Sequence, residues 1–297
     1  MTSDPIGWER LRAIFCNPPP VREVWERQFD YFDEELQQLG RTPHDQVEFG
    51  DLWYYYHDLA YVELQPDLFA HLFPVCLMDW HRSLIANQTC AHGDSEFHKA
   101  VRRGDVFDKM LTIVQRKQVE SVCRDSMLYR LDQERGFAFD GMHTPAFGWL
   151  MRMNSLGLIS HELHLLWQAW WEMSTPGRAV AFLEYCSALL YVYDESPLID
   201  VRTGSAWHVG PCWENDSLLL DGGWLQENVE FIRTYVTAAR ITDVVHQAVR
   251  VLQNEPESHV AAQIAVDLEL RTELLERRLS ELPTLLTVAD GRLDWSE

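Results

Sequence analysis

Apolar residues recur every three to four positions along most of this chain of 297 residues, and this spacing limits the fold more than any other feature. Between positions 21 and 39, acidic residues fall outside an apolar stripe made of Val21, Val24, Trp25, Phe29, Phe32, Leu36 and Leu39. A period near 3.6 residues is that of an amphipathic helix. We therefore expect a mostly α, multi-helix globular protein with at most a small β-hairpin near 198–209.

Proline, glycine and threonine mark where the expected helices begin and end. Thr144-Pro145 and Thr175-Pro176 each place a capping side chain before a proline at the first helical position. Pro74 should kink or split its helix, because proline removes one main-chain hydrogen bond. The aromatic run at 53–56 fits a strand or the start of a helix. We expect helices over 6–15, 21–39, 66–84, 106–131 (as one helix or two), 224–252 and 258–283.

The domain organisation is less constrained than the helices. A chain of this length suits two domains, although one large domain is also within reach. Gly136 and Gly141 interrupt the helical pattern just before the Thr144-Pro145 helix start. We place a boundary there, so that residues 1–140 and 141–297 form two helical halves, or else the two halves form a single domain.

The charge of the chain bears on its partners. It has 46 acidic and 25 basic residues, a formal net charge of −21. Such a surface repels phosphate backbones and anionic membranes, so we expect neither nucleic acid nor membrane as a partner, and a basic protein is favoured. No apolar stretch approaches the roughly 20 residues that a membrane-spanning helix needs. Isolated cysteines and the lack of a basic-then-apolar leader favour a cytoplasmic location.

One short segment holds the residue types of a metal site. Two imidazoles and two carboxylates stand within seven residues, at His92, Asp94, Glu96 and His98. They form the ligand set of divalent transition metals such as zinc. If a helix begins near Ser95, then Asp94 caps it and His92 faces His98 from the preceding loop. The simpler interpretation is a capped helix with surface histidines, because no known metal-site spacing is matched.

A second histidine pair resembles a metalloprotease motif only in part. In the sequence His161-Glu162-Leu163-His164 the two histidines are three positions apart. The zinc-protease motif separates them by four, with a glutamate as general base. These residues are better explained as the polar opening of a helix that Ser160 caps.

Tryptophan and acidic residues gather in the C-terminal half, in a stretch that breaks the helical pattern. Aromatic residues anchor protein interfaces, and acidic ones attract a cationic partner. A solvated acidic loop with buried tryptophans is the alternative. The candidate binding residues are Trp207, Trp213, Glu214, Asp216, Asp221 and Trp224.

Common catalytic motifs are missing from the sequence. It contains no P-loop, no glycine-rich dinucleotide motif, no serine-nucleophile elbow and no kinase motif set. We therefore expect a non-enzymatic protein that binds a basic partner, as an inhibitor or immunity protein does, without a cofactor. The alternative function is a metal-dependent, hydrolase-like enzyme built on residues 92–98.

Overall fold

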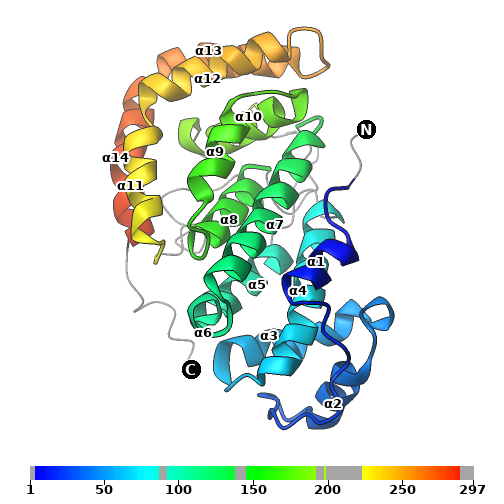
Figure 1. Cartoon of the computed structure of the whole chain (residues 1–297). Coiled ribbons are helices and arrows are strands. Elements are labelled where there is room, and N and C mark those ends of the chain that lie inside the picture. Colours follow the sequence, from blue (N-terminus) through cyan, green and yellow to red (C-terminus); the bar gives the residue numbers. More distant parts are fainter. Residues whose placement is uncertain (1–3, 87–91, 138–144, 192–196, 199–222, 288–297) are drawn as a thin grey trace. The chain divides into compact units, whose positions relative to one another are not determined.

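The computed structural model describes residues 4–86, 92–137, 145–191, 197–198 and 223–287 (Figure 1). Within these ranges the chain forms 14 α-helices, two short 3₁₀ helices and no strand, which confirms the expected mostly α fold. The expected hairpin near 198–209 lies outside the described residues, apart from Leu198. None of the described helices is long and apolar enough to cross a membrane.

The chain divides into two compact units, with the division inside one helix, between Ser126 and Met127. The first unit contains α1 (Trp8–Ile14), α2 (Asp33–Arg41), η1 (His44–Gln46), η2 (Phe49–Asp51), α3 (Leu52–Tyr61), α4 (Pro66–Ala86), α5 (His92–Arg103), α6 (Val106–Met110) and the beginning of α7 (Ile113–Asp132). The sequence boundary expected at 136–143 lies mostly outside the described residues, and the halves 1–140 and 141–297 stay a prediction.

Helix α4 is the centre of the first unit and contacts α1, α2 and α5. Thirteen of its 21 residues are buried, Pro74 among them. The alternative that Pro74 splits this helix is wrong, because the packing of so many buried side chains outweighs one missing hydrogen bond. The ambiguous run at 53–56 is helical and belongs to α3.

The second unit is organised around one almost entirely buried helix, α10 (Pro176–Leu190). Its Thr175 cap was predicted correctly, since the Thr175 side chain accepts a hydrogen bond from the Arg178 N–H. Helix α11 lies beside α14 in Figure 1. The helices that contact α10 are α8 (Pro145–Gly157), α9 (Leu163–Trp171), α12 (Ala238–Val251), α13 (Ser258–Leu270) and α14 (Thr272–Thr287), and α11 (Gln226–Tyr235) contacts α9 and α14.

Two expected long helices of the second unit are each divided in two. Residues 224–252 form α11 and α12, because the Thr237 side chain caps α12 by accepting the Arg240 N–H. The expected helix from Ser258 breaks at Arg271 and continues past Pro283 to Thr287. The Arg271 guanidinium donates to the Leu190 carbonyl, so a contact with another helix holds the break.

The most informative difference concerns the helix expected over 21–39. Only its last part is helical, as α2, and residues 23–28 form neither a helix nor a strand. Their side chains from Trp25 onward alternate between exposed and buried, as in an extended chain. The main-chain N–H groups of Trp25 and Glu26 donate to the Gln65 side chain, and the Phe29 N–H donates to Asp58. Side chains from elsewhere in the unit thus replace the hydrogen bonds that a helix would have supplied.

Candidate functional site

The extended segment alternates exposed and buried side chains. Trp25 is 56% exposed and Phe29 45% exposed, whereas Glu26 and Gln28 are only 3% and 4% exposed. Successive side chains of an extended chain point to opposite sides. Trp25 and Phe29 of the expected helical stripe therefore face outward, whereas its Val21, Leu36 and Leu39 are buried. Two polar residues of the same segment, Glu26 and Gln28, face inward.

Exposed aromatic rings gather where this segment meets α3. Phe29 stacks on Tyr61 with ring centroids 4.4 Å apart, and the rings of Trp53 and His57 are 4.9 Å apart. Phe29 also contacts His57 edge-on. We call Phe29, Trp53, His57 and Tyr61 the aromatic face.

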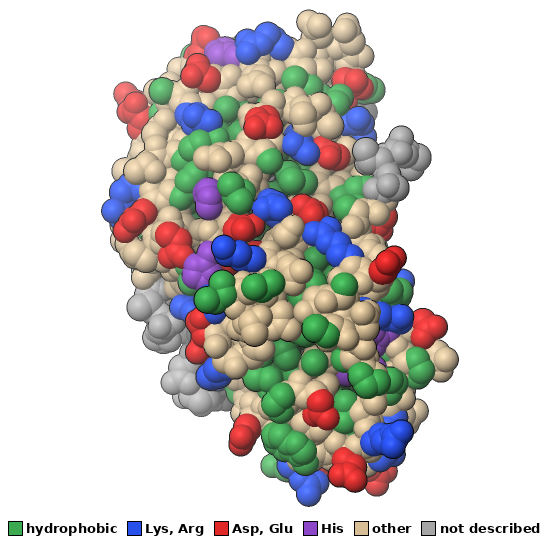
Figure 2. All heavy atoms as spheres, viewed as in Figure 1, with side chains coloured by type: hydrophobic (Ala, Val, Ile, Leu, Met, Phe, Trp, Pro, Cys, Tyr) green, Lys and Arg blue, Asp and Glu red, His purple; other side chains and the backbone are tan. Residues whose placement is uncertain are grey.

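Every exposed large aromatic side chain in the described part of the chain belongs to this region. Besides Phe29, Trp53 and Tyr61, the set contains only Trp25 and the 94% exposed Tyr31. Figure 2 shows hydrophobic side chains at the surface over the part that holds α2 and α3 in Figure 1, mixed with charged ones. Clustered rather than scattered exposed aromatics mark binding surfaces.

Charged groups surround the aromatic face. His57 Nδ1 lies 2.5 Å from an Asp30 oxygen, and the Arg103 guanidinium lies 4.2 Å from the centroid of Tyr61. Residues 23–67 contain 12 acidic residues and only two basic ones, Arg27 and Arg41. This stretch therefore contributes −10 to the chain's net charge of −21.

Two carboxyl groups are buried behind the aromatic face. Burial raises the pKa of Glu26 to about 8, against the hydrogen bond from the Gln65 N–H and with a smaller contribution from the nearby Asp58. Burial also raises the pKa of Asp58 to about 7, against the hydrogen bond from the Phe29 N–H. One oxygen of each carboxyl, and the hydroxyl of buried Tyr55, have no hydrogen-bond partner in the described part of the chain. These three groups interact electrostatically.

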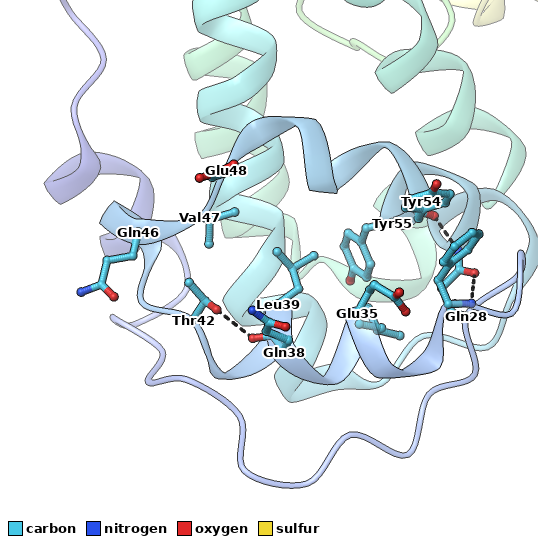
Figure 3. Close-up of a pocket in the computed structure, with 12 residues that line it drawn as sticks. Gln28, Glu35, Gln38, Leu39, Thr42, Gln46, Val47, Glu48, Tyr54 and Tyr55 are labelled. Carbon is cyan, nitrogen blue, oxygen red and sulfur yellow. Dashed lines mark hydrogen bonds between the residues drawn. The ribbon is translucent and has the colours of Figure 1, made fainter.

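A cavity of about 400 Å³ lies in the same unit, between α2, the 42–48 segment and α3 (Figure 3). We call it the α2–α3 cavity. In Figure 3 the Tyr55 side chain extends from α3 towards α2. Its lining residues are Gln28, Phe32, Glu35, Leu36, Gln38, Leu39, Thr42, Gln46, Val47, Glu48, Tyr54 and Tyr55.

Gln28 holds one wall of this cavity in place. Its side-chain amide donates to the Tyr54 carbonyl, and its side-chain oxygen accepts the Phe32 N–H, which just precedes α2. The rings of Phe32 and Tyr54 lie 4.1 Å apart between centroids. Both helices that flank the cavity are therefore tied to one buried glutamine.

Of the tryptophan-and-acid residues proposed from the sequence, only Trp224 lies in the described part of the chain. Trp224 is buried, its indole N–H donates to Asn154, and its ring covers Gly157. It is a core residue of the second unit. Trp207, Trp213, Glu214, Asp216 and Asp221 lie outside the described residues.

The histidine-and-carboxylate segment begins a helix earlier than expected. Helix α5 starts at His92, so His92 does not face the cluster from a loop. Glu96 is exposed, whereas His98 is buried against Trp80, and burial lowers the pKa of His98 to about 3. The side chains of His92 and Asp94 are outside the described set, and among the side chains described no group of three or more His, Cys, Asp or Glu could hold a metal ion.

The second histidine pair is divided by the start of α9 at Leu163. His161 lies before the helix and pairs with Glu227, whereas the His164 ring contacts Phe231. The Ser160 hydroxyl accepts the Glu162 N–H just before the helix. Each histidine therefore has a local contact in the second unit, and the two do not share one helix face.

No protein-family model, curated protein or solved structure matches the chain. Its function must be inferred from its own residues. Sequence reasoning missed the aromatic face and the α2–α3 cavity, although a signal was present. Residues 53–57 combine four aromatic residues with a histidine inside the most acidic part of the chain.

Proposed function

We propose that this chain binds and neutralises a basic protein partner, as an inhibitor or immunity protein does, and that the partner docks on the aromatic face. One observation carries the proposal. The exposed large aromatic side chains of the described residues all fall within a stretch that also contributes about half of the chain's net negative charge. Aromatic anchors supply binding energy, and opposite charge speeds the encounter of two proteins.

The contacts inside the face support a cationic partner. Arg103 already stacks on Tyr61, so the rings hold a guanidinium group of the chain itself. A guanidinium over an aromatic ring is stabilised by the electron-rich face of the ring. Asp30 beside His57, together with exposed Glu23 and Glu63, would pair with further basic residues of a partner.

The tryptophan-and-acid stretch at 207–224 is a secondary part of this proposal. Its acidic residues would add to the attraction of the same basic partner. Trp224 itself is not offered as an anchor, because its ring packs in the second unit. No contact within the described residues favours the metal-dependent alternative.

A defined cationic probe tests the proposal on the full chain. Fluorescein-labelled nona-arginine should bind, and nona-glutamate should not. The double variant Phe29→Ala, Trp53→Ala should weaken nona-arginine binding at least about ten-fold, because exposed aromatic anchors dominate such interfaces. The matched control is Val266→Ala, Leu270→Ala, which removes two exposed apolar side chains from α13.

A charge-matched comparison separates local binding from the attraction of any acidic protein. Glu23→Gln with Asp30→Asn removes two charges of the acidic 23–67 stretch, of which Asp30 pairs with His57 of the aromatic face, and Glu273→Gln with Glu276→Gln removes two exposed charges from α14. We expect the first pair to weaken binding several-fold more than the second. Equal effects of the two pairs would contradict a binding site on the aromatic face.

A further inference from the structure

The α2–α3 cavity is lined by acceptors of positive charge and by no basic side chain. Glu35 and Glu48 are the charged residues of its wall, and Gln38 and Gln46 add amide groups. The side chains of these four residues make no hydrogen bond or ion pair with any other described residue. Both glutamates are exposed at the rim of the cavity, and two carboxylates with no counter-charge raise the local affinity for a cation.

The cavity also has a flat aromatic wall. Phe32 and Tyr54 lie close together on it, and Leu36, Leu39 and Val47 supply apolar contacts. Its volume of about 400 Å³ falls in the range of small-molecule pockets, roughly 300–1,000 Å³. Tyr55, which is 1% exposed, lines it, and the Tyr55 hydroxyl has no hydrogen-bond partner among the described residues.

A guanidinium group fits this lining better than an ammonium group. It is planar and can stack on an aromatic wall, and its five N–H donors can bond to carboxylate and amide oxygens together. An ammonium is a compact, strongly hydrated charge that gains less from a flat apolar wall. The apolar residues of the lining suit the methylene groups of an arginine side chain.

We propose that the α2–α3 cavity is a binding site for a guanidinium group, with Phe32 and Tyr54 as its stacking wall and Glu35 as its counter-charge, while Glu48, at the other end of the cavity in Figure 3, adds to the negative potential. The group can belong to an arginine side chain of the basic partner, in which case this inference rests on the proposed function. It can also belong to a free guanidino compound, in which case the cavity is a small-molecule site of its own.

Titration calorimetry with small probes tests the chemistry directly. N-acetyl-arginine amide should bind the full chain, and N-acetyl-citrulline amide, its neutral analogue of nearly the same shape, should bind at least ten-fold more weakly. N-acetyl-lysine amide should fall between them. Absence of a difference between the arginine and citrulline probes would overturn the inference.

Variants of the lining residues test whether the arginine probe binds in the α2–α3 cavity. Glu35→Gln with Glu48→Gln should weaken binding of the arginine probe at least ten-fold, and Phe32→Leu should weaken it several-fold. The matched control Glu281→Gln, which removes an exposed charge of α14 outside the cavity, should leave it unchanged. Circular dichroism checks that each variant folds, and the single variant Glu35→Gln serves if the double variant does not. An unchanged affinity in the folded Glu35 and Glu48 variants would also overturn the inference.

The same variants distinguish the two sources of the guanidinium group. If they weaken both the small probe and nona-arginine, the cavity takes an arginine of a polypeptide. If they weaken only the small probe, the cavity takes a free guanidino compound. The Phe29→Ala, Trp53→Ala variant does not alter the cavity lining, so its effect on nona-arginine judges the proposed function separately.

Discussion

Gln65 and Glu26 hydrogen-bond to each other in both directions. The Gln65 side-chain oxygen accepts the Glu26 main-chain N–H, and the Glu26 carboxyl accepts the Gln65 main-chain N–H. The same Gln65 oxygen also accepts the Trp25 N–H at 2.7 Å. This pairing holds the 23–28 segment extended and so turns Trp25 and Phe29 outward.

Replacing Gln65 should therefore cost both stability and binding. Gln65→Leu leaves the Glu26 N–H and the Trp25 N–H without their acceptor, and each buried unpaired group costs about 1–3 kcal/mol. We expect the free energy of unfolding to fall by about 2–4 kcal/mol in urea titrations. The control Gln263→Leu removes an exposed glutamine of α13 and should change stability by less than about 0.5 kcal/mol.

Glu26 should make the first unit less stable as the pH rises. Its folded pKa of about 8 lies above the ordinary value of 4.5, so the folded state favours the protonated form. The resulting stability is fully present below pH 4.5 and is lost as the pH rises towards 8. Glu26→Gln keeps an oxygen for the Gln65 N–H but cannot ionise. At each pH the free energy of unfolding of Glu26→Gln is compared with that of the native chain. This difference should favour the variant by at least about 1 kcal/mol more at pH 8 than at pH 4.5, because a pKa shift of one unit is about 1.4 kcal/mol.

Asp58 offers a second check on the same effect. Its pKa is raised from 3.8 to about 7. The stability of Asp58→Asn relative to the native chain should therefore also rise with pH, but the rise should end near pH 7. The exposed control Glu281→Gln should show no such gain. Urea unfolding at pH 4.5, 6 and 8 measures all three variants. A Glu26→Gln variant whose stability relative to the native chain does not rise over this range would contradict the protonated state assigned to Glu26.

His44 should make the same unit less stable at acidic pH. Burial, with a smaller contribution from the neighbouring His71, lowers the pKa of His44 to about 4. Arg12 Nε donates to His44 Nδ1 at 3.0 Å, so that nitrogen is the acceptor and Nε2 carries the proton for the His71 carbonyl. A depressed histidine pKa means that stability is lost as the pH falls from about 6.5 towards 4. Nuclear magnetic resonance should place the His44 pKa below 5, and a value near 6.5 would contradict this environment.

The sequence predicted the class of fold and those helix starts that depend on neighbouring residues. The cap at Thr175 needs only a side chain, a proline and the next turn, all of which are local. The extended 23–28 segment depends on Gln65 and Asp58, which stand about 30 to 40 positions further along the chain. A 3.6-residue apolar pattern cannot report such distant acceptors, and this is why a helix was expected there.

Of the candidate site, the sequence predicted only the residue types and the charge of the expected partner. Acidic and aromatic residues were expected to meet a basic partner, and residues 23–67 hold both. Their exposure depends on the side of the main chain that each residue occupies, and the extended conformation reverses the side expected for Trp25 and Phe29. The α2–α3 cavity depends on how Gln28 ties α2 to α3, which involves residues 26 positions apart.

The contact of Trp224 with Gly157 predicts a double-variant cycle in the second unit. A Cβ on Gly157 would lie 2.3 Å from the Trp224 ring, so Gly157→Ala should cost about 1–3 kcal/mol by overpacking. Trp224→Ala should cost about 3–5 kcal/mol through the cavity that it leaves. The double variant should cost less than the sum, because the methyl group added at position 157 enters the space of the missing ring. Gly50→Ala, where a Cβ meets nothing within 4 Å, is the control.

Association kinetics should separate the charges of the aromatic face from its rings. Surface charges act on the encounter over a Debye length of about 8 Å at physiological ionic strength, so Glu23→Gln with Asp30→Asn should mainly lower the association rate of nona-arginine. Phe29→Ala with Trp53→Ala removes contacts made after the encounter and should mainly raise the dissociation rate. Surface plasmon resonance at 50 mM and 300 mM salt measures both rates.

Salt should act on the two variants differently. In the native chain the association rate should fall as salt rises, and the charge variant should lose part of this dependence because two of the attracting carboxylates are gone. The ring variant should keep the full salt dependence, since its charges are unchanged. The exposed pair Glu273→Gln, Glu276→Gln on α14 is the control and should behave like the native chain. If the ring variant dissociates no faster than the native chain, Phe29 and Trp53 do not contact the bound cation, and the aromatic face is not the docking surface.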